Sequence, residues 1–142
     1  MLARQRNGSV EDWLRRRRTV VPIQLALDDV VIHTILEGHV TDEELLSHYA
    51  LPIFQEHRAA WRELVDGREV TDMAVTAEGQ RRLAALATTS AERLRGWRVA
   101  MVASSDVMYG MFRMWELQRE GLGYEVHVFR DIEEARTWVA PP

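Results

Sequence analysis

The sequence predicts an α/β domain: a mixed sheet of about five strands with helices mainly on one side. Two observations carry this prediction. Residues 20–27 and 30–37 are rich in β-branched and aliphatic side chains and are joined by a short reversal, which is typical of a hairpin. From residue 60 onward, strands alternate with helices over short connections, and this order builds a parallel sheet through right-handed crossovers.

Capping signals indicate where the helices begin and end. Thr41 and Glu44 form a capping box, and Pro52 should kink or end the helix that follows, because proline removes a helical hydrogen bond. Thr76 can cap a second helix, which Gly96 closes. We expect strands at 20–27, 30–37, 60–65, 97–103 and 124–129, a loop at 66–75, and helices after Thr41, at 77–95, at 107–120 and from 131.

The composition excludes several classes of protein. A chain of 142 residues with 46% hydrophobic and 28% charged residues is typical of one globular domain. Without cysteine it has no disulfide, thiolate zinc site or cysteine nucleophile. A net charge of −4 argues against nucleic acid as a partner. The first residues lack the apolar core of a signal peptide, so we expect a cytoplasmic protein.

Residues 1–18 differ from the rest and are interpreted as an N-terminal extension of a domain at 19–142. Apolar residues at helical spacing around Trp13 favour a short amphipathic helix. The run Arg15–Arg18 has two interpretations. It contacts anionic lipid or an acidic partner, or it is the solvated end of that helix.

Catalytic signatures are absent from the sequence. The five histidines lack the spacing of metal ligands, no nucleophile elbow surrounds a serine, and no glycine-rich dinucleotide loop follows a strand. We therefore expect no catalytic residue, no metal and no cofactor.

The helix expected at 107–120 carries an unusually wide apolar arc. Such an arc exceeds what a helix on one side of a sheet needs, so part of it should be exposed to a second subunit or a lipid-like ligand. The alternative is a broad contact with the core. The candidate binding residues are Met108, Tyr109, Met111, Phe112 and Trp115.

Six phrases along residues 22–139 carry a family resemblance. They are GHVTDEEL (38–45), ELVD (63–66), TAEG (76–79), RVAMVA (98–103), YGMFRM (109–114) and VFRD (128–131). Their order and spacing resemble the SpoIIAA-like family, a branch of the STAS domain group that includes the anti-sigma-factor antagonists. The resemblance implies an α/β sandwich of the STAS kind, acting as a binding or regulatory module without catalysis and discussed in connection with ligand binding and membrane association.

The resemblance also marks a regulatory turn. Antagonists of this group are switched by phosphorylating a serine in an Asp-Ser-Ser-Gly turn after the third strand. The turn corresponds here to Thr76, Ala77, Glu78 and Gly79, so Glu78 takes the place of the switched serine. Glu78 either complements the helix dipole or acts as a permanent phosphate mimic. The resemblance places no phosphate on Thr76 or Thr71.

These observations favour a non-enzymatic STAS-like module that engages a partner protein, a second copy of itself, or a small apolar or lipid-like ligand. One alternative is a peripheral membrane regulator that uses Trp13 and the arginine run. A second alternative is an enzyme with a histidine and a carboxylate at the strand ends, for example His39 with Asp66.

Overall fold

The computed structural model describes residues 22–56 and 60–142. The described strands form one sheet in the order β1-β2-β3-β4-β5. β1 and β2 pair antiparallel as a hairpin, and β2 to β5 run parallel, so the predicted mixed sheet of five strands is confirmed. The strands are β1 (Ile23–Asp28), β2 (Val31–Thr41), β3 (Arg62–Ala74), β4 (Arg98–Val102) and β5 (Glu125–Phe129).

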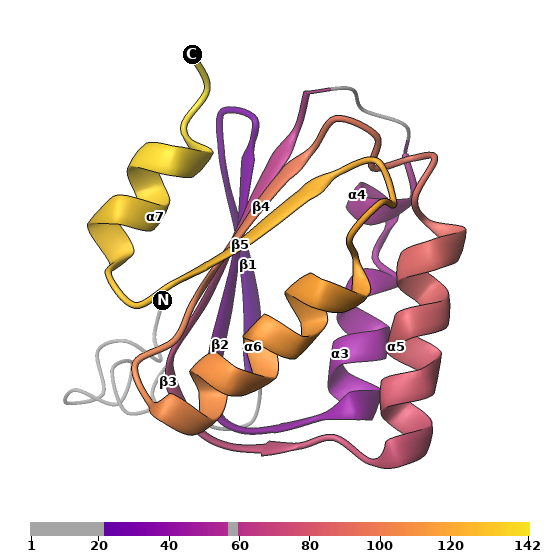
Figure 1. The fold of residues 1–142 in the computed structure, drawn as a ribbon, viewed down its shortest axis with the longest axis vertical. Helices are drawn as coiled ribbons and strands as arrows, with labels where there is room; N and C mark the ends of the chain where they lie inside the picture. Colours follow the sequence, from indigo (N-terminus) through magenta and orange to yellow (C-terminus); the bar gives the residue numbers. More distant parts are fainter. Residues whose placement is uncertain (1–21, 57–59) are drawn as a thin grey trace, which may run out of the picture.

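Helices lie on both faces of this sheet but mainly on one. Figure 1 shows α3 and α5 on one side and α7 on the opposite side. Pro52 is the first residue of α4, where its missing N–H costs nothing, so the proline separates two helices. The described helices are α3 (Asp42–Tyr49), α4 (Pro52–Gln55), α5 (Ala77–Thr89), α6 (Asp106–Gln118) and α7 (Ile132–Val139).

Each face of the sheet has its own hydrophobic core. The larger core joins residues such as Ile32 and Val99 on the strands to Leu83 of α5 and Phe112 of α6. The smaller core joins alternate strand residues, Leu64 among them, to α7. Because successive side chains of a strand point to opposite faces, one strand serves both cores.

The third strand is much longer than the sequence predicts. Residues 66–75 were expected as a loop, but β3 continues to Ala74 and pairs with the second half of β2. The dipeptide Asp66-Gly67 is typical of a turn, yet Gly67 serves close packing. A Cβ at Gly67 would lie 2.9 Å from the ring of Phe112 and 3.1 Å from the carbonyl of Val102.

The capping predictions are confirmed at both predicted helix starts. The Thr41 N–H donates to Glu44 at 2.8 Å, and the Glu44 N–H donates to the Thr41 hydroxyl at 3.2 Å. Thr76 caps α5, but this helix ends at Thr89 with Ser90 as its C-cap, six residues before the predicted end at Arg95.

Some predictions fall outside the described residues. They concern the N-terminal extension, with Trp13 and Arg15–Arg18, and residues 20 and 21 of the first predicted strand. Within the described chain, no helix is long and apolar enough to cross a membrane.

Candidate functional site

A carboxyl group lies buried in the middle of the sheet. Glu63 of β3 pairs with Ile32 of β2 and Val99 of β4, and it is 4% exposed. Its side chain faces the larger core, on the side of α3 and α5, since its neighbour Leu64 belongs to the smaller core beneath α7 on the other face. A carboxyl group without water must be satisfied by other protein groups.

Two hydroxyl groups donate hydrogen bonds to the Glu63 carboxyl group. Thr34 of β2 and Tyr49 of α3 both donate to Oε2 of Glu63, at 2.6 and 2.9 Å. Nε2 of His48 lies 3.0 Å from the Thr34 oxygen. A threonine hydroxyl has one proton, so Thr34 donates it to Glu63 and accepts from His48. This network assigns the His48 tautomer with the proton on Nε2.

Burial controls the protonation of this network. It raises the pKa of Glu63 from 4.5 to about 7, against the hydrogen bonds from Thr34 and Tyr49 and the charge of Arg119. It lowers the pKa of His48 from 6.5 to about 4. Burial, and then the charge of Glu63, raise the pKa of Tyr49 well above 10.0. Near neutral pH, His48 and Tyr49 are therefore neutral, and Glu63 is divided between its two forms.

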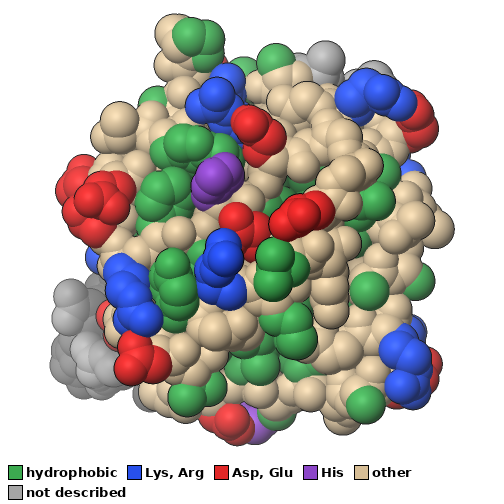
Figure 2. Space-filling view, in the orientation of Figure 1, with side chains coloured by type: hydrophobic (Ala, Val, Ile, Leu, Met, Phe, Trp, Pro, Cys, Tyr) green, Lys and Arg blue, Asp and Glu red, His purple; other side chains and the backbone are tan. Residues whose placement is uncertain are grey.

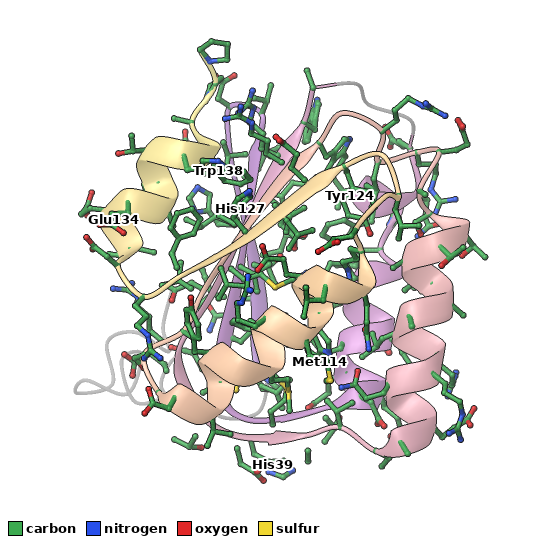
Figure 3. The ribbon with its side chains drawn as sticks, viewed as in Figure 1. His39, Met114, Tyr124, His127, Glu134 and Trp138 are labelled. Atoms are coloured by element: carbon green, nitrogen blue, oxygen red, sulfur yellow. The ribbon has the colours of Figure 1, made fainter. Side chains whose placement is uncertain are left out.

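Glu63 and Tyr49 line a cavity of about 80 Å³. The cavity lies between the sheet and α5, where Leu83, Leu86 and Ala87 form part of its wall. Figure 3 labels Tyr124 where the chain passes from α6 into β5. Five aromatic side chains line the cavity: Tyr49, Phe54, Trp97, Trp115 and Tyr124.

Polar side chains hold the aromatic wall in place. The indole N–H of Trp115 donates to Gln80 at 2.9 Å. Arg119, which also lines the cavity, donates to the carbonyl of Trp115 at 2.9 Å. Burial raises the pKa of Tyr124, and the charge of Arg119 acts against this. The wall therefore joins α5, α6 and the start of β5.

Three of the five candidate binding residues of the α6 arc lie in the core, which is the alternative that the sequence left open. Met108, Phe112 and Trp115 are 4%, 0% and 5% exposed, because they form the inner face of α6 against the sheet. Trp115 nevertheless reaches the cavity. Tyr109 and Met111 are half-buried, and the guanidinium of Arg130 lies 4.2 Å above the Tyr109 ring.

A different set of residues forms the outer apolar stripe of α6. Val107, Met114 and Leu117 are 77%, 40% and 56% exposed. Figure 2 shows hydrophobic side chains interspersed with charged ones on this face of the molecule, and Figure 3 labels Met114 on α6. Gly110 lies within the stripe, and a Cβ there would meet no atom within 4 Å.

Replacing Gly110 by alanine should stabilise the protein. Glycine inside a helix costs about 0.5–1 kcal/mol relative to alanine, and nothing near Gly110 would obstruct a methyl group. We expect the free energy of unfolding to rise by about that amount in urea denaturation. A loss of stability would show that the glycine is needed for close approach within the monomer.

The turn at Thr76 lies at the start of the helix after β3, where the resemblance puts the regulatory turn. The turn links the start of α5 to the start of α3 through hydrogen bonds. The Thr76 hydroxyl accepts from the Gly79 N–H at 2.9 Å and donates to Asp42 at 2.6 Å. A Cβ at Gly79 would lie 1.9 Å from the Asp42 carboxylate. Glu78 points away and pairs with Arg81 at 2.7 Å.

This turn permits a matched pair of substitutions. Thr76→Val removes the cap and should cost about 1–2 kcal/mol of unfolding free energy. Glu78→Ser removes only an exposed charge near the helix N-terminus and should cost at most about 0.3–1 kcal/mol. Thermal or urea denaturation measures both. Equal losses would contradict the structural role given to Thr76.

The structure does not bring His39 and Asp66 together. His39 pairs with Asp72 at 2.8 Å, and Asp66 pairs with Arg68 at 2.9 Å. The strand partner of Asp66 is Ile35, so His39 lies roughly 13 Å further along β2. The specific pair suggested for an enzyme is therefore wrong.

A further described histidine, His127, packs against aromatic rings. On β5, His127 lies 4.7 Å from the Trp138 ring of α7, and Figure 3 shows the two side by side. Residues 22–56 and 60–142 contain no group of three or more His, Cys, Asp and Glu side chains that could hold a metal ion.

The sequence reasoning missed Glu63, Thr34, His48 and Tyr49. One signal was present. In the strand around Glu63, alternate positions carry Trp61 and Val65, so the glutamate occupies an inward position of an otherwise apolar face.

A scan of protein-family models finds no match to this chain, and a search of curated proteins finds none either. Among solved structures, the chain is similar to an uncharacterized protein of the DUF3478 family from Shewanella loihica PV-4, described as having a SpoIIAA-like fold. The TM-score is 0.58 at 15% sequence identity, over 83% of this chain and 92% of that one. At this identity the similarity establishes the fold alone, and it confirms the SpoIIAA-like resemblance.

Proposed function

We propose that this chain is a non-enzymatic binding module that holds a small, largely apolar ligand in the cavity between the sheet, α5 and α6. The observation that carries the proposal is the wall of this cavity. It is built mainly of aromatic and aliphatic side chains around one buried carboxyl group. Ligand sites are typically apolar hollows with a few placed polar groups that fix orientation.

Glu63 is also the observation that favours an enzyme as the second candidate. A buried carboxyl with a pKa near neutrality is suited to general acid–base catalysis. Binding remains the better-supported function because the neighbouring groups are occupied. The Tyr49 hydroxyl donates its hydrogen bond to a Glu63 oxygen, and the Ser90 hydroxyl of the wall accepts from Arg93 at 3.0 Å. Among the described lining residues, no nucleophile is paired with a base.

Filling the cavity tests the proposal. Ala87 is buried in the wall, whereas Ala85 lies on the exposed side of the same helix. Ala87→Leu should abolish the binding of small apolar molecules, measured through the fluorescence of Trp97 and Trp115. Ala85→Leu should leave binding unchanged. Native mass spectrometry of the gently purified protein should show a retained ligand that Ala87→Leu removes. Equal binding by both variants would contradict a ligand in this cavity.

We also propose that α6 contacts a second copy of the chain. The support is its outer stripe of Val107, Met114 and Leu117 with the open glycine between them. Leu117→Glu should convert the dimer to a monomer in native mass spectrometry, because it puts a charge into an apolar contact. The neighbouring exposed substitution Gln118→Glu should not. A wild-type monomer at every concentration would refute this contact.

The membrane-surface alternative depends on Trp13 and Arg15–Arg18, which lie outside the described residues. Its test is salt-sensitive binding to anionic liposomes that is lost when residues 1–18 are removed.

A further inference from the structure

The buried carboxyl group of the cavity has no ion-pair partner in the described part of the chain. No ion pair within the described residues includes Glu63. Arg119 is the cation of the wall and acts on Glu63 through its charge, but it is half-buried and its guanidinium donates to the carbonyl of Trp115 instead of to Glu63. A buried carboxylate is costly without a paired charge, so a ligand that brings a cation would relieve this cost.

One oxygen of Glu63 is free to receive such a ligand. Both hydroxyl donors, Thr34 and Tyr49, bond to Oε2. No group in the described part of the chain donates to Oε1, although Glu63 lines the cavity. The site therefore offers one acceptor at the cavity wall with a full or partial negative charge.

The rest of the wall suits an alkylated cation. Five aromatic rings line the cavity, and aromatic faces attract cations through their quadrupole. The volume of about 80 Å³ is roughly half that of an apolar cavity that holds benzene, so by proportion to the six carbons of benzene it leaves space for about three to four non-hydrogen atoms. A tertiary ammonium ion such as trimethylammonium has this size, one N–H donor and three methyl groups.

We propose that the cavity binds a small tertiary alkylammonium group, whose N–H donates to Oε1 of Glu63 and whose methyl groups pack against the aromatic wall. The proposal rests on the proposed function, because it names the chemical class of ligand for the same cavity. An anion fits less well. It would bring a second negative charge beside Glu63, and the cation that could attract it, Arg119, is partly screened by solvent.

Binding should depend on pH through Glu63. Its pKa of about 7 means that the ionised fraction rises from roughly a tenth near pH 6 to roughly nine tenths near pH 8. A cation binds the ionised form and displaces the proton. Affinity should therefore be about tenfold higher at pH 8 than at pH 6.

The other titratable and charged groups that face Glu63 should not change the pH dependence of binding between pH 6 and pH 8. His48, behind Thr34, has a pKa of about 4. Tyr49 and Tyr124 have pKa values raised above 10.0. Arg119 is the remaining charged group of the wall. The lining residues of α5 and β4 within the described chain carry no titratable group.

Calorimetric titration of the full chain with three probes of equal size tests the proposal. The probes are trimethylammonium, isopropanol and acetate, each with four non-hydrogen atoms. We expect trimethylammonium to bind most tightly, about tenfold more tightly at pH 8 than at pH 6. Isopropanol should bind weakly and without pH dependence, and acetate should not bind.

Matched variants test whether the pH-dependent binding of trimethylammonium depends on Glu63. Glu63→Gln should weaken trimethylammonium binding at pH 8 by about tenfold or more and remove its pH dependence, with isopropanol binding retained. Glu78→Gln, on an exposed carboxylate, should change neither. Binding of isopropanol as tight as that of trimethylammonium, or acetate binding that strengthens as pH falls, would overturn the ammonium ligand and leave the cavity function standing. Failure of all three probes would overturn both.

Discussion

Phe112→Ala should lower the free energy of unfolding by about 3–5 kcal/mol, the usual cost of removing a buried phenylalanine ring. Phe112 is 0% exposed, and its ring lies against the space that Gly67 leaves open in β3. It also packs 5.6 Å from the ring of Trp115. Its loss would open a void between α6 and the sheet that neighbouring side chains cannot fill. Urea denaturation at constant pH measures the change.

The matched control lies on the same helix. Val107 is 77% exposed, so Val107→Ala should change stability by no more than about 0.5 kcal/mol. A large difference between the two variants confirms that the inner face of α6 is core and that its outer stripe is free. If Phe112→Ala cost as little as Val107→Ala, the apolar arc would be a surface site after all.

Glu63→Gln should change how stability depends on pH. In the wild-type protein, the pKa of Glu63 rises from 4.5 in the unfolded chain to about 7 in the folded one. The folded state then binds more protons than the unfolded state. Glu63 therefore adds to the free energy of unfolding below pH 4.5, and this addition is lost as pH rises to about 7. His48 acts in the opposite direction. Its pKa falls from 6.5 to about 4, so its contribution is present above 6.5 and lost as pH falls to about 4.

The two contributions oppose each other through the mildly acid range. Glutamine keeps the shape of Glu63 and can accept from Thr34 and Tyr49, but it does not titrate. Of these two contributions only that of His48 is left in Glu63→Gln, and the free energy of unfolding should rise with pH by about 2 kcal/mol across two pH units. The wild-type profile should be nearly flat there. Urea denaturation from pH 4.5 to 6.5 compares them, with Glu78→Gln as the control that should follow the wild type. Parallel profiles for Glu63→Gln and the wild type would show that Glu63 titrates like an exposed carboxyl.

The fold could be predicted because its signals are local. The Thr41 capping box, the Thr76 cap and the alternation of strands with helices each depend on neighbouring residues in the sequence. The prediction failed at Gly67, where a dipeptide typical of a turn is instead a point of close packing with Phe112 on a distant helix. No local pattern distinguishes these two uses of glycine.

The candidate site could not be predicted because its parts come from separate elements. Thr34, Tyr49 and Glu63 lie on β2, α3 and β3, and they meet only when the sheet forms beneath the helices. The apolar arc of α6 was visible in the sequence, but its periodicity does not say which edge faces the core. That is why the inner residue Phe112 was named as a candidate binding residue and the exposed outer residue Leu117 was not.

The central claim is that the proposed ligand cavity holds one acid, Glu63, which is buried and has no ion-pair partner among the described residues. The most direct test is a carbon-13 NMR titration of the glutamate carboxyl groups, with Glu63→Gln used to assign the Glu63 signal. We expect this signal to titrate near pH 7, apart from the exposed glutamates. A midpoint near the ordinary value of 4.5 would mean that Glu63 is solvated or paired, and it would contradict the account.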